Sequence, residues 1–368
     1  MKWSWRAGSL FGIAVYIHWT FVILLGWIAL GHVQSDGTFL QFAIGVLSIA
    51  VLFGVVLLHE LGHSLMARRF GIETKDITLL PIGGLARLER MPDKPRQEFW
   101  VAIAGPAVNV ALALIAFVIL QFRGAHGVLP EELGFATHPL EQFYAVNVYL
   151  VLFNMLPAFP MDGGRVLRAV LASRLPYAQA TRIAASIGQG MALLFVFAGV
   201  MTGNFMLLFI ALFVWLGAEG EASMAQVKSL LGDARIGEAM ITRFRALSPH
   251  DPLSAAVDDI FSGFQQDFPV LDHAGRLMGI LTYAGIIRGL SETGPRAPVA
   301  NAMSPDFGSC SSTDRIEEVL PKLQASGAST FAVMDQGVLV GLVTLGNLSE
   351  FIMVRGALQH GAGAAGPR

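Results

Sequence analysis

One apolar segment constrains this chain more than any other. From Phe39 to Met66 the only ionisable side chains are His59, Glu60 and His63, which form an H-E-x-x-H motif. As a helix the segment is ~42 Å long, more than the hydrocarbon core of a bilayer. Charged and imidazole groups at that depth are costly and persist mainly where they perform chemistry. The segment therefore predicts a membrane helix that carries a functional site.

The spacing within the motif indicates which chemistry this is. On a helix His59 and His63 lie four residues apart, so both imidazoles leave one face toward a single metal ion. Glu60 lies beside them as a potential base. Buried polar groups need partners, and a zinc ion would supply one. The motif predicts a zinc hydrolase that works within the membrane.

Composition supports a membrane protein and excludes some other classes. Hydrophobic residues make up 54% of the chain and charged residues 14%, with a mean hydropathy of +0.58, far from the average of soluble proteins. The net charge of −2 comes without a basic stripe, so nucleic-acid binding is not expected. The single cysteine, Cys310, excludes an internal disulfide and a cysteine-based zinc site.

Hydrophobicity falls abruptly near Glu219, and six membrane spans are predicted before it. They are 12–30, 39–66, 99–122, 140–157 and a close pair within 183–218 that turns at 202–204. Loops 67–98 and 158–182 are rich in Lys and Arg, whereas loops 31–38, 123–139 and 202–204 hold only Arg123. By the positive-inside rule, both termini of this multi-pass plasma-membrane protein are cytoplasmic.

The loop 67–98 contains an apolar stretch, Leu79–Leu85, that is broken by one proline and two glycines. One alternative is a hairpin or re-entrant loop beside the active site, since irregular backbone is tolerated at membrane depth where it lines a cavity. The other alternative is an ordinary surface turn.

The chain after residue 233 has a soluble α/β pattern that repeats. Met240 recurs as Met303, and Gly279–Thr282 recurs as Gly341–Thr344. Each copy is predicted as a helix, two short strands and a second helix. The predicted fold is a multi-pass α-helical membrane domain followed by an α/β pair, divided into 1–222, a linker 223–235, copies at 236–291 and 296–355, and a disordered tail 356–368.

A catalytic zinc usually takes three protein ligands, so one further ligand is needed. Asp162 is the main candidate, because it follows a predicted span and is flanked by Pro160 and two glycines that free the backbone. It lies at the same membrane depth as the two histidines. Glu219 and Glu221 are the alternatives.

These motifs together resemble a known family. The H-E-x-x-H motif, the N-x-x-P-x-x-P-x-D-G run of Asn154–Gly163 and the G-P-x-x-N run of Gly105–Asn109 resemble the site-2 protease family of intramembrane zinc metalloproteases. The repeated C-terminal unit resembles a pair of CBS domains, and the combination is similar to the prokaryotic branch of the family that carries such a pair.

The resemblance implies one Zn²⁺ per chain, held by His59, His63 and Asp162, with Glu60 as general acid and base. Asn154 would bind the substrate backbone or the oxyanion, or else form a hydrogen bond between helices. Two other polar residues in apolar spans, Asn109 and His18, are expected to pack or to support the ligands through hydrogen bonds.

A CBS pair implies binding of an adenine nucleotide, whose ribose is held by a T-x-x-D motif. The first copy has Gly285 in place of the acid and the second has Asn347, so Thr344 and Asn347 form the better candidate site. The alternative is a module for dimerisation or substrate docking.

The predicted function is an intramembrane zinc endopeptidase that cleaves membrane-spanning proteins in regulated intramembrane proteolysis, with a cytoplasmic CBS pair that regulates or docks. Its expected partners are such substrates, the lipid bilayer and a second copy bound through the CBS domains. The alternative is a CBS-regulated transporter, but the repeated halves typical of many transporters are absent from the membrane-domain sequence.

Overall fold

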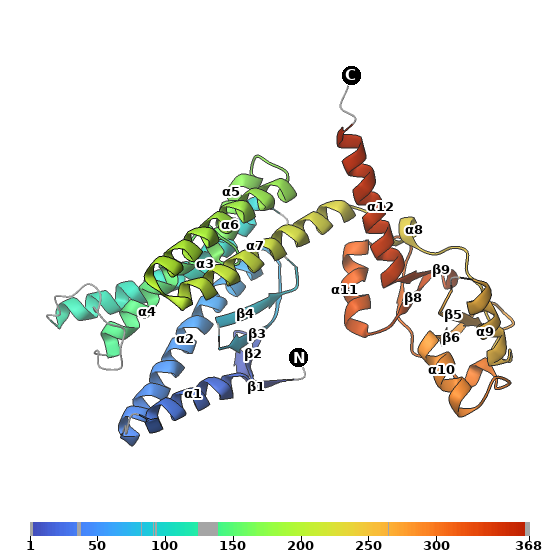
Figure 1. Cartoon of the computed structure of the whole chain (residues 1–368), viewed down its shortest axis with the longest axis horizontal. Helices are drawn as coiled ribbons and strands as arrows, with labels where there is room; N and C mark the ends of the chain where they lie inside the picture. Colours follow the sequence, from blue (N-terminus) through green and yellow to red (C-terminus); the bar gives the residue numbers. More distant parts are fainter. Residues whose placement is uncertain are drawn as a thin grey trace. The chain divides into compact units, whose positions relative to one another are not determined.

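In the computed structural model of the protein, the chain divides into two compact units, Met1–Ala225 and Gln226–Arg368 (Figure 1). The structure describes residues 3–34, 38–81, 83–90, 92, 94–123, 139–263 and 265–364. Each unit is taken by itself below.

The first unit begins with strands rather than with a membrane span. A four-stranded sheet has the order β1-β2-β3-β4, in which the β2–β3 pair is parallel and the two outer pairs are antiparallel. Its strands are β1 (Ser4–Leu10), β2 (Ile13–His18), β3 (Thr74–Leu80) and β4 (Gly83–Leu88). The predicted span 12–30 is therefore wrong in its first part. Ile13 packs with Ile77 and with Leu61 of the second helix, so its apolar side chain covers that helix instead of facing lipid.

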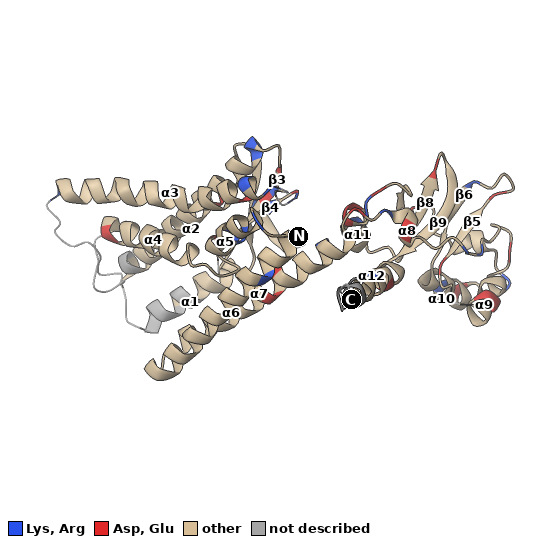
Figure 2. Cartoon of the chain, turned by 90° about the horizontal axis from the view of Figure 1, so that it is seen from above, with Lys and Arg blue, Asp and Glu red and all other residues tan. Residues whose placement is uncertain are grey.

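The remainder of this unit is helical. The helices are α1 (Phe21–Gln34), α2 (Phe39–Arg69), α3 (Pro95–Phe122), α4 (Pro139–Asn154), α5 (Asp162–Ala172), α6 (Tyr177–Thr202) and α7 (Phe205–Leu231). Among the described residues, four helices are long and apolar enough to cross a membrane: 42–69, 95–122, 177–202 and 205–231. Figure 2 shows α3 and α6 almost without charged residues along their lengths.

Four of the six predicted spans are thus matched by long apolar helices among the described residues. Helices α1 and α4 have 14 and 16 described residues, which extend ~21 and ~24 Å at 1.5 Å per residue. Both helices border on residues outside the described part of the chain. The predicted turn at 202–204 is present between α6 and α7, where Gly203 adopts the left-handed conformation that ends α6.

Helix α3 lies at the centre of the first unit and contacts α2, α4 and α5. Its approach to α2 is close, because a Cβ atom at Gly62 would lie 2.7 Å from the carbonyl oxygen of Ala104. Small residues at such crossings let helix backbones approach each other in membranes. The two helices that carry the H-E-x-x-H and G-P-x-x-N motifs are therefore in direct contact.

The second unit contains the two predicted copies. The first comprises α8 (Ile236–Ala239), α9 (Leu253–Ser262), β5 (Phe268–Leu271), β6 (Leu277–Leu281) and α10 (Tyr283–Glu292). The second comprises η1 (Val299–Asn301), β7 (Ser309–Cys310), α11 (Ile316–Ser326), β8 (Thr330–Asp335), β9 (Val338–Thr344) and α12 (Leu345–Ala364). Helix α12 includes 356–364, which were predicted to be disordered, and 365–368 lie outside the described residues.

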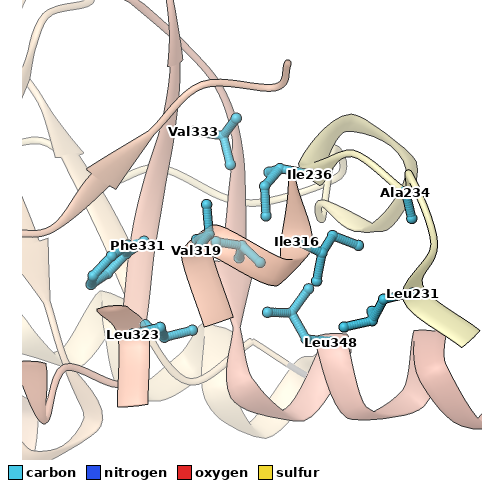
Figure 3. Close-up of a cluster of buried hydrophobic side chains, with 10 residues drawn as sticks. Leu231, Ala234, Ile236, Ile316, Val319, Leu323, Phe331, Val333 and Leu348 are labelled. Atoms are coloured by element: carbon cyan, nitrogen blue, oxygen red, sulfur yellow. The ribbon is translucent and has the colours of Figure 1, made fainter. Parts of the chain in front are cut away.

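The two copies exchange segments. Ile241, from the first copy, pairs with Leu342 on β9, and Ser304 pairs with Ile280 on β6. The core of the second copy also takes in residues from before the first copy (Figure 3), since Leu231 and Ala234 of the predicted linker are 3% and 2% exposed there. The copies therefore form one interlocked unit.

Candidate active site

Three side chains predicted as metal ligands meet in one cluster. His59 and His63 on α2 and Asp162 at the start of α5 are all buried. The Nε2 atoms of the two histidines are 3.1 Å apart, and each is 3.1 Å from Oδ2 of Asp162. Among the described residues, this is the group found with the composition and closeness of a metal site.

The double glycine after Asp162 explains how the carboxylate reaches the histidines. A Cβ atom at Gly163 would lie 2.3 Å from the carbonyl oxygen of Leu156, and one at Gly164 would lie 2.7 Å from the backbone of Ala158. Helix α5 can therefore begin directly against the preceding turn only when both positions lack a side chain. That close start places Asp162, the first residue of α5, at the metal cluster.

Hydrogen bonds on the far side of each ring determine which nitrogens face the cluster. Nδ1 of His63 lies 2.7 Å from the carbonyl oxygen of Val101, which can only accept a hydrogen bond. Nδ1 of His59 lies 2.5 Å from Oδ1 of Asn109. Both Nδ1 atoms therefore carry a proton, and in neutral rings the Nε2 lone pairs face each other and Asp162.

Three acceptors that face one another without a proton between them repel, and a cation removes this repulsion. Tetrahedral zinc with bonds of ~2.0 Å separates its ligand atoms by ~3.3 Å. The 3.1 Å triangle of two nitrogens and one oxygen fits three corners of that tetrahedron. The donor set and its spacing therefore fit zinc, with a fourth position for water or substrate.

Gly105 leaves the space that this centre needs. A Cβ atom at this position on α3 would lie 2.3 Å from Nε2 of His63 and 2.8 Å from Nε2 of His59. The glycine of the G-P-x-x-N motif thus lies directly against the ligand atoms.

Glu60 lies under the β3–β4 hairpin. A Cβ atom at Gly84 would be 2.6 Å from Cγ of Glu60 and 3.0 Å from its Oε1. Of the two alternatives for the loop 67–98, the structure has the hairpin beside the active site. Strand β4 is an edge strand, because it pairs only with β3 in the described sheet.

Two other predicted groups have different surroundings. Asn154 donates from Nδ2 to the carbonyl oxygen of Leu150, 3.0 Å away in its own helix. Nδ1 of His18 lies 2.8 Å from the hydroxyl of Thr20, so its contact is local packing. Asn109 instead supports a ligand, as its contact with His59 shows.

The two alternative acids are engaged elsewhere. Glu221 accepts a hydrogen bond from Nη1 of Arg168 at 2.6 Å, and Glu219 accepts one from Gln189 at 3.0 Å. Neither belongs to the metal cluster of the described residues. Of the three candidate acids, only Asp162 lies beside both histidines.

A buried ion cluster, which the sequence analysis did not predict, lies a little under two turns along α5 from Asp162. Arg168 is 1% exposed and its side chain pairs with both Glu98 on α3 and Glu221 on α7 at 2.6 Å. Its guanidinium also lies over the rings of Phe159 and Tyr177. This arginine points inward and joins α3, α5 and α7.

The CBS unit contains a cavity of about 750 Å³ between the two copies. Polar and charged residues from both copies line it, including Arg243, Arg245, Asp267, Thr330 and Thr344. Asp267 is 9% exposed, and it accepts hydrogen bonds from the hydroxyls of Ser329 and Thr330 at 2.5 Å. These acidic and basic lining residues were missed because they lie outside the T-x-x-D positions.

Thr344 lines this cavity, whereas the lining does not include Asn347. Oδ1 of Asn347 accepts a hydrogen bond from the backbone NH of Thr344 at 2.7 Å, and its Nδ2 donates to the carbonyl oxygen of Ala239. One end of the amide thus caps the start of α12, and the other end holds the last residue of α8.

Comparison with known proteins agrees with this geometry. The sequence profile of peptidase family M50 matches residues 47–137 and 131–197, and that of the CBS domain matches 236–292 and 299–354. The zinc metalloprotease MJ0392 of Methanocaldococcus jannaschii is 30% identical over 345 residues, covering 94% of each chain. Stage IV sporulation protein FB of Bacillus subtilis is 33% identical over 130 residues, covering 35% of this chain and 42% of the relative.

A solved structure is also similar. The site-2 protease from Methanocaldococcus jannaschii has 35% sequence identity and a TM-score of 0.45, covering 60% of this chain and 95% of that protein. The M50 profile and the 30% identity to MJ0392 over 94% of each chain show that this chain belongs to the site-2 type of peptidase family M50, which are integral membrane zinc metalloproteases. It also carries a C-terminal CBS pair. The transporter alternative is wrong.

Proposed function

We propose that this zinc metalloprotease cleaves peptide bonds of membrane-spanning proteins within or beside the bilayer. The observation that carries the proposal is the meeting of His59, His63 and Asp162, on a helix apolar enough to span a membrane, with Glu60 adjacent in sequence. Such a site would hydrolyse substrates that soluble proteases cannot reach.

In this mechanism His59, His63 and Asp162 would hold the metal. Zinc, when bound, would polarise the scissile carbonyl and lower the pKa of a water molecule toward ~7. The carboxylate of Glu60 would accept a proton from the attacking water and later deliver it to the leaving amine nitrogen. The bond broken is the peptide C–N bond, and the products are a carboxylate and an amine.

Strand β4 would bind the substrate in an extended form. A peptide bond inside a helix is shielded by the helix itself, so the substrate must unwind before cleavage. The free edge of β4 offers backbone donors and acceptors to such a segment, and Gly84 holds this strand against Glu60. Asn154 remains a candidate for binding the substrate backbone or oxyanion, a role in which it gives up its bond to Leu150.

Substitution of Glu60 by glutamine tests the proposal. The amide keeps the size of the side chain but cannot take up a proton, so cleavage of a single-span substrate in proteoliposomes should fall by roughly 10²- to 10⁴-fold. Zinc content should stay unchanged. The exposed Glu73 gives a matched control as Glu73→Gln. Full activity of the zinc-loaded Glu60 variant would disprove this role.

The position of the protein in the membrane is part of the proposal. We place both termini and the metal-binding end of α2 on the cytoplasmic side of the plasma membrane, because loops 67–98 and 158–182 carry most of the basic residues of the domain 1–222. Labelling of single cysteines in a Cys310→Ser background from each side of the membrane tests this. Labelling of positions in these loops only from the outside would contradict it.

For the CBS pair we propose control of proteolysis by an adenine nucleotide bound in the cavity that Thr344 lines, with docking or dimerisation as the alternative role. A ligand can act only through unequal affinity for two arrangements of the protein. Calorimetry of the full chain with millimolar ATP, ADP and AMP distinguishes these roles. Absence of heat in all three titrations would leave docking and dimerisation.

A further inference from the structure

A buried chain of amides connects helix α4 to the metal centre. Asn109 on α3 and Asn147 on α4 are both 0% exposed, and neither is a predicted metal ligand. Nδ2 of Asn109 donates to Oδ1 of Asn147 at 3.0 Å, and Nδ2 of Asn147 donates to the carbonyl oxygen of Phe143 at 2.8 Å. The chain ends at the 2.5 Å contact between Oδ1 of Asn109 and Nδ1 of His59.

The direction of this chain is fixed at its start. An amide side chain has a donor end and an acceptor end of nearly the same shape, so its orientation depends on its partners. The carbonyl oxygen of Phe143 can only accept, which turns the NH₂ group of Asn147 toward it and leaves Oδ1 toward Asn109. Asn109 must then donate to Asn147 and can offer His59 only an acceptor.

The orientation of Asn109 decides which nitrogen of His59 carries the proton. With an acceptor at Nδ1 the proton stays there, and Nε2 keeps the lone pair that a metal needs. If Asn109 turned over, its NH₂ group would face Nδ1 and the proton would move to Nε2. Nε2 would then donate to Oδ2 of Asp162, 3.1 Å away, and two ligands would satisfy each other without metal.

We propose that Asn147 is a positioning residue that holds His59 in its metal-binding tautomer by fixing the orientation of Asn109. The proposal rests on the proposed role of His59 as a zinc ligand. His63 needs no such relay, because its Nδ1 faces the backbone carbonyl of Val101 directly. The two ligands of α2 therefore depend on α4 to different degrees.

A double-mutant cycle on the full-length protein in detergent tests the relay. In Asn147→Leu the orientation of Asn109 is no longer fixed, so the zinc affinity measured by chelator competition should fall roughly 10- to 100-fold. In Asn109→Asp the carboxylate can only accept, so His59 keeps its tautomer without help, but the second carboxylate oxygen then faces the acceptor Oδ1 of Asn147. Adding Asn147→Leu to that variant should therefore not lower the affinity, because it removes this facing acceptor and no amide orientation is left to fix.

If Asn147→Leu lowered the zinc affinity equally in the wild type and in Asn109→Asp, Asn147 would act through packing alone and the relay would be overturned. Wild-type zinc affinity in Asn147→Leu would also overturn it. A wild-type protein without zinc affinity would instead overturn the proposed function. The ¹⁵N signals of the histidines in the metal-free wild type give a second measurement that needs no variant. Protonation of His59 at Nδ1 is expected, and protonation at Nε2 would contradict the relay.

Discussion

The metal centre and the CBS cavity differ in how closely their sequence motifs match their geometry. At the metal centre the three ligands implied by the motifs meet within 3.1 Å of one another. In the CBS unit Thr344 lines the cavity, but Asn347 uses one end of its amide at the start of α12 and the other at Ala239 of α8.

The difference comes from the surroundings of the two sites. Among apolar helices every polar atom must find a partner in the protein, so few arrangements of His59, His63 and Asp162 are tolerated. In a cavity open to water, unpaired polar groups are solvated at little cost. Motif residues there can change partners, and other residues such as Asp267 can take over the lining.

The largest expected effect lies at the crowded metal centre. Gly105→Ala places a Cβ atom 2.3 Å from Nε2 of His63, within the space that the metal and its ligands occupy. Zinc binding measured after dialysis and proteolysis should both be abolished, while unfolding of the CBS unit should not change. Gly54→Ala on α2, where a Cβ atom meets nothing within 4 Å, is the control. Zinc retained by the Gly105 variant would show that the centre is looser than its geometry indicates.

The next effect compares a buried ion pair with an exposed one. Arg168→Met leaves the buried Glu98 without its partner, and the free energy of unfolding should fall by roughly 3–5 kcal/mol. Arg245→Met breaks a pair with Asp259 in which the arginine side chain is 68% exposed, and should cost only about 0–1 kcal/mol. Denaturant titration of the two variants in mixed micelles gives both values.

The double variant Glu98→Gln/Arg168→Met serves as the control for that pair. It removes the unpaired charge, so part of the lost stability should return. Equal, small losses in Arg168→Met and Arg245→Met would contradict the contrast between the two regions.

The smallest effect concerns a carboxylate in the CBS unit. Hydrogen bonds from the hydroxyl and NH of Ser312 and from the hydroxyl of Ser311 lower the pKa of Asp335. A lowered folded-state pKa contributes stability above the unfolded-state value of about 3.9, and this contribution disappears as the pH falls through the folded-state pKa.

Asp335→Asn should therefore melt at a lower temperature than the wild type at pH 7, and the difference should shrink as the pH falls below about 4. Thermal scans of the full chain between pH 3 and 7 measure this. Asp258→Asn, at another acidic position of the CBS unit, is a control without such bonds to serine in the described contacts. A pH-independent difference would assign the effect of Asp335→Asn to shape rather than to charge.

Much of the metal centre could be predicted from the sequence, because its ligands lie in short motifs whose spacing determines their geometry. The spacing of His59 and His63 fixes their common face, and the prolines and glycines around Asp162 indicate where the chain turns inward. The residues that support the ligands could not be predicted in detail. Asn147 lies one helix away from His59, and its register on α4 against α3 depends on packing that no local pattern encodes.

The fold was predictable to a similar extent. The long apolar helices and the repeated α/β unit were correct, but the β-strand Ile13–His18 was assigned to a span, because apolar residues that cover a helix resemble those that face lipid. Likewise, Arg168 has the spacing of a solvated face, and only its contacts with Glu98 and Glu221 show that it points inward.

The cluster around Arg168 also has a consequence for the synthesis of the protein. Glu98, at the start of α3, is made 70 residues before Arg168. At ~5–20 residues per second a ribosome needs several seconds for that interval. During that interval the carboxylate of Glu98 lacks the partner with which it is buried in the folded protein. Final packing of the first turn of α3 therefore waits for α5, which makes it a late step in the assembly of the active-site helices.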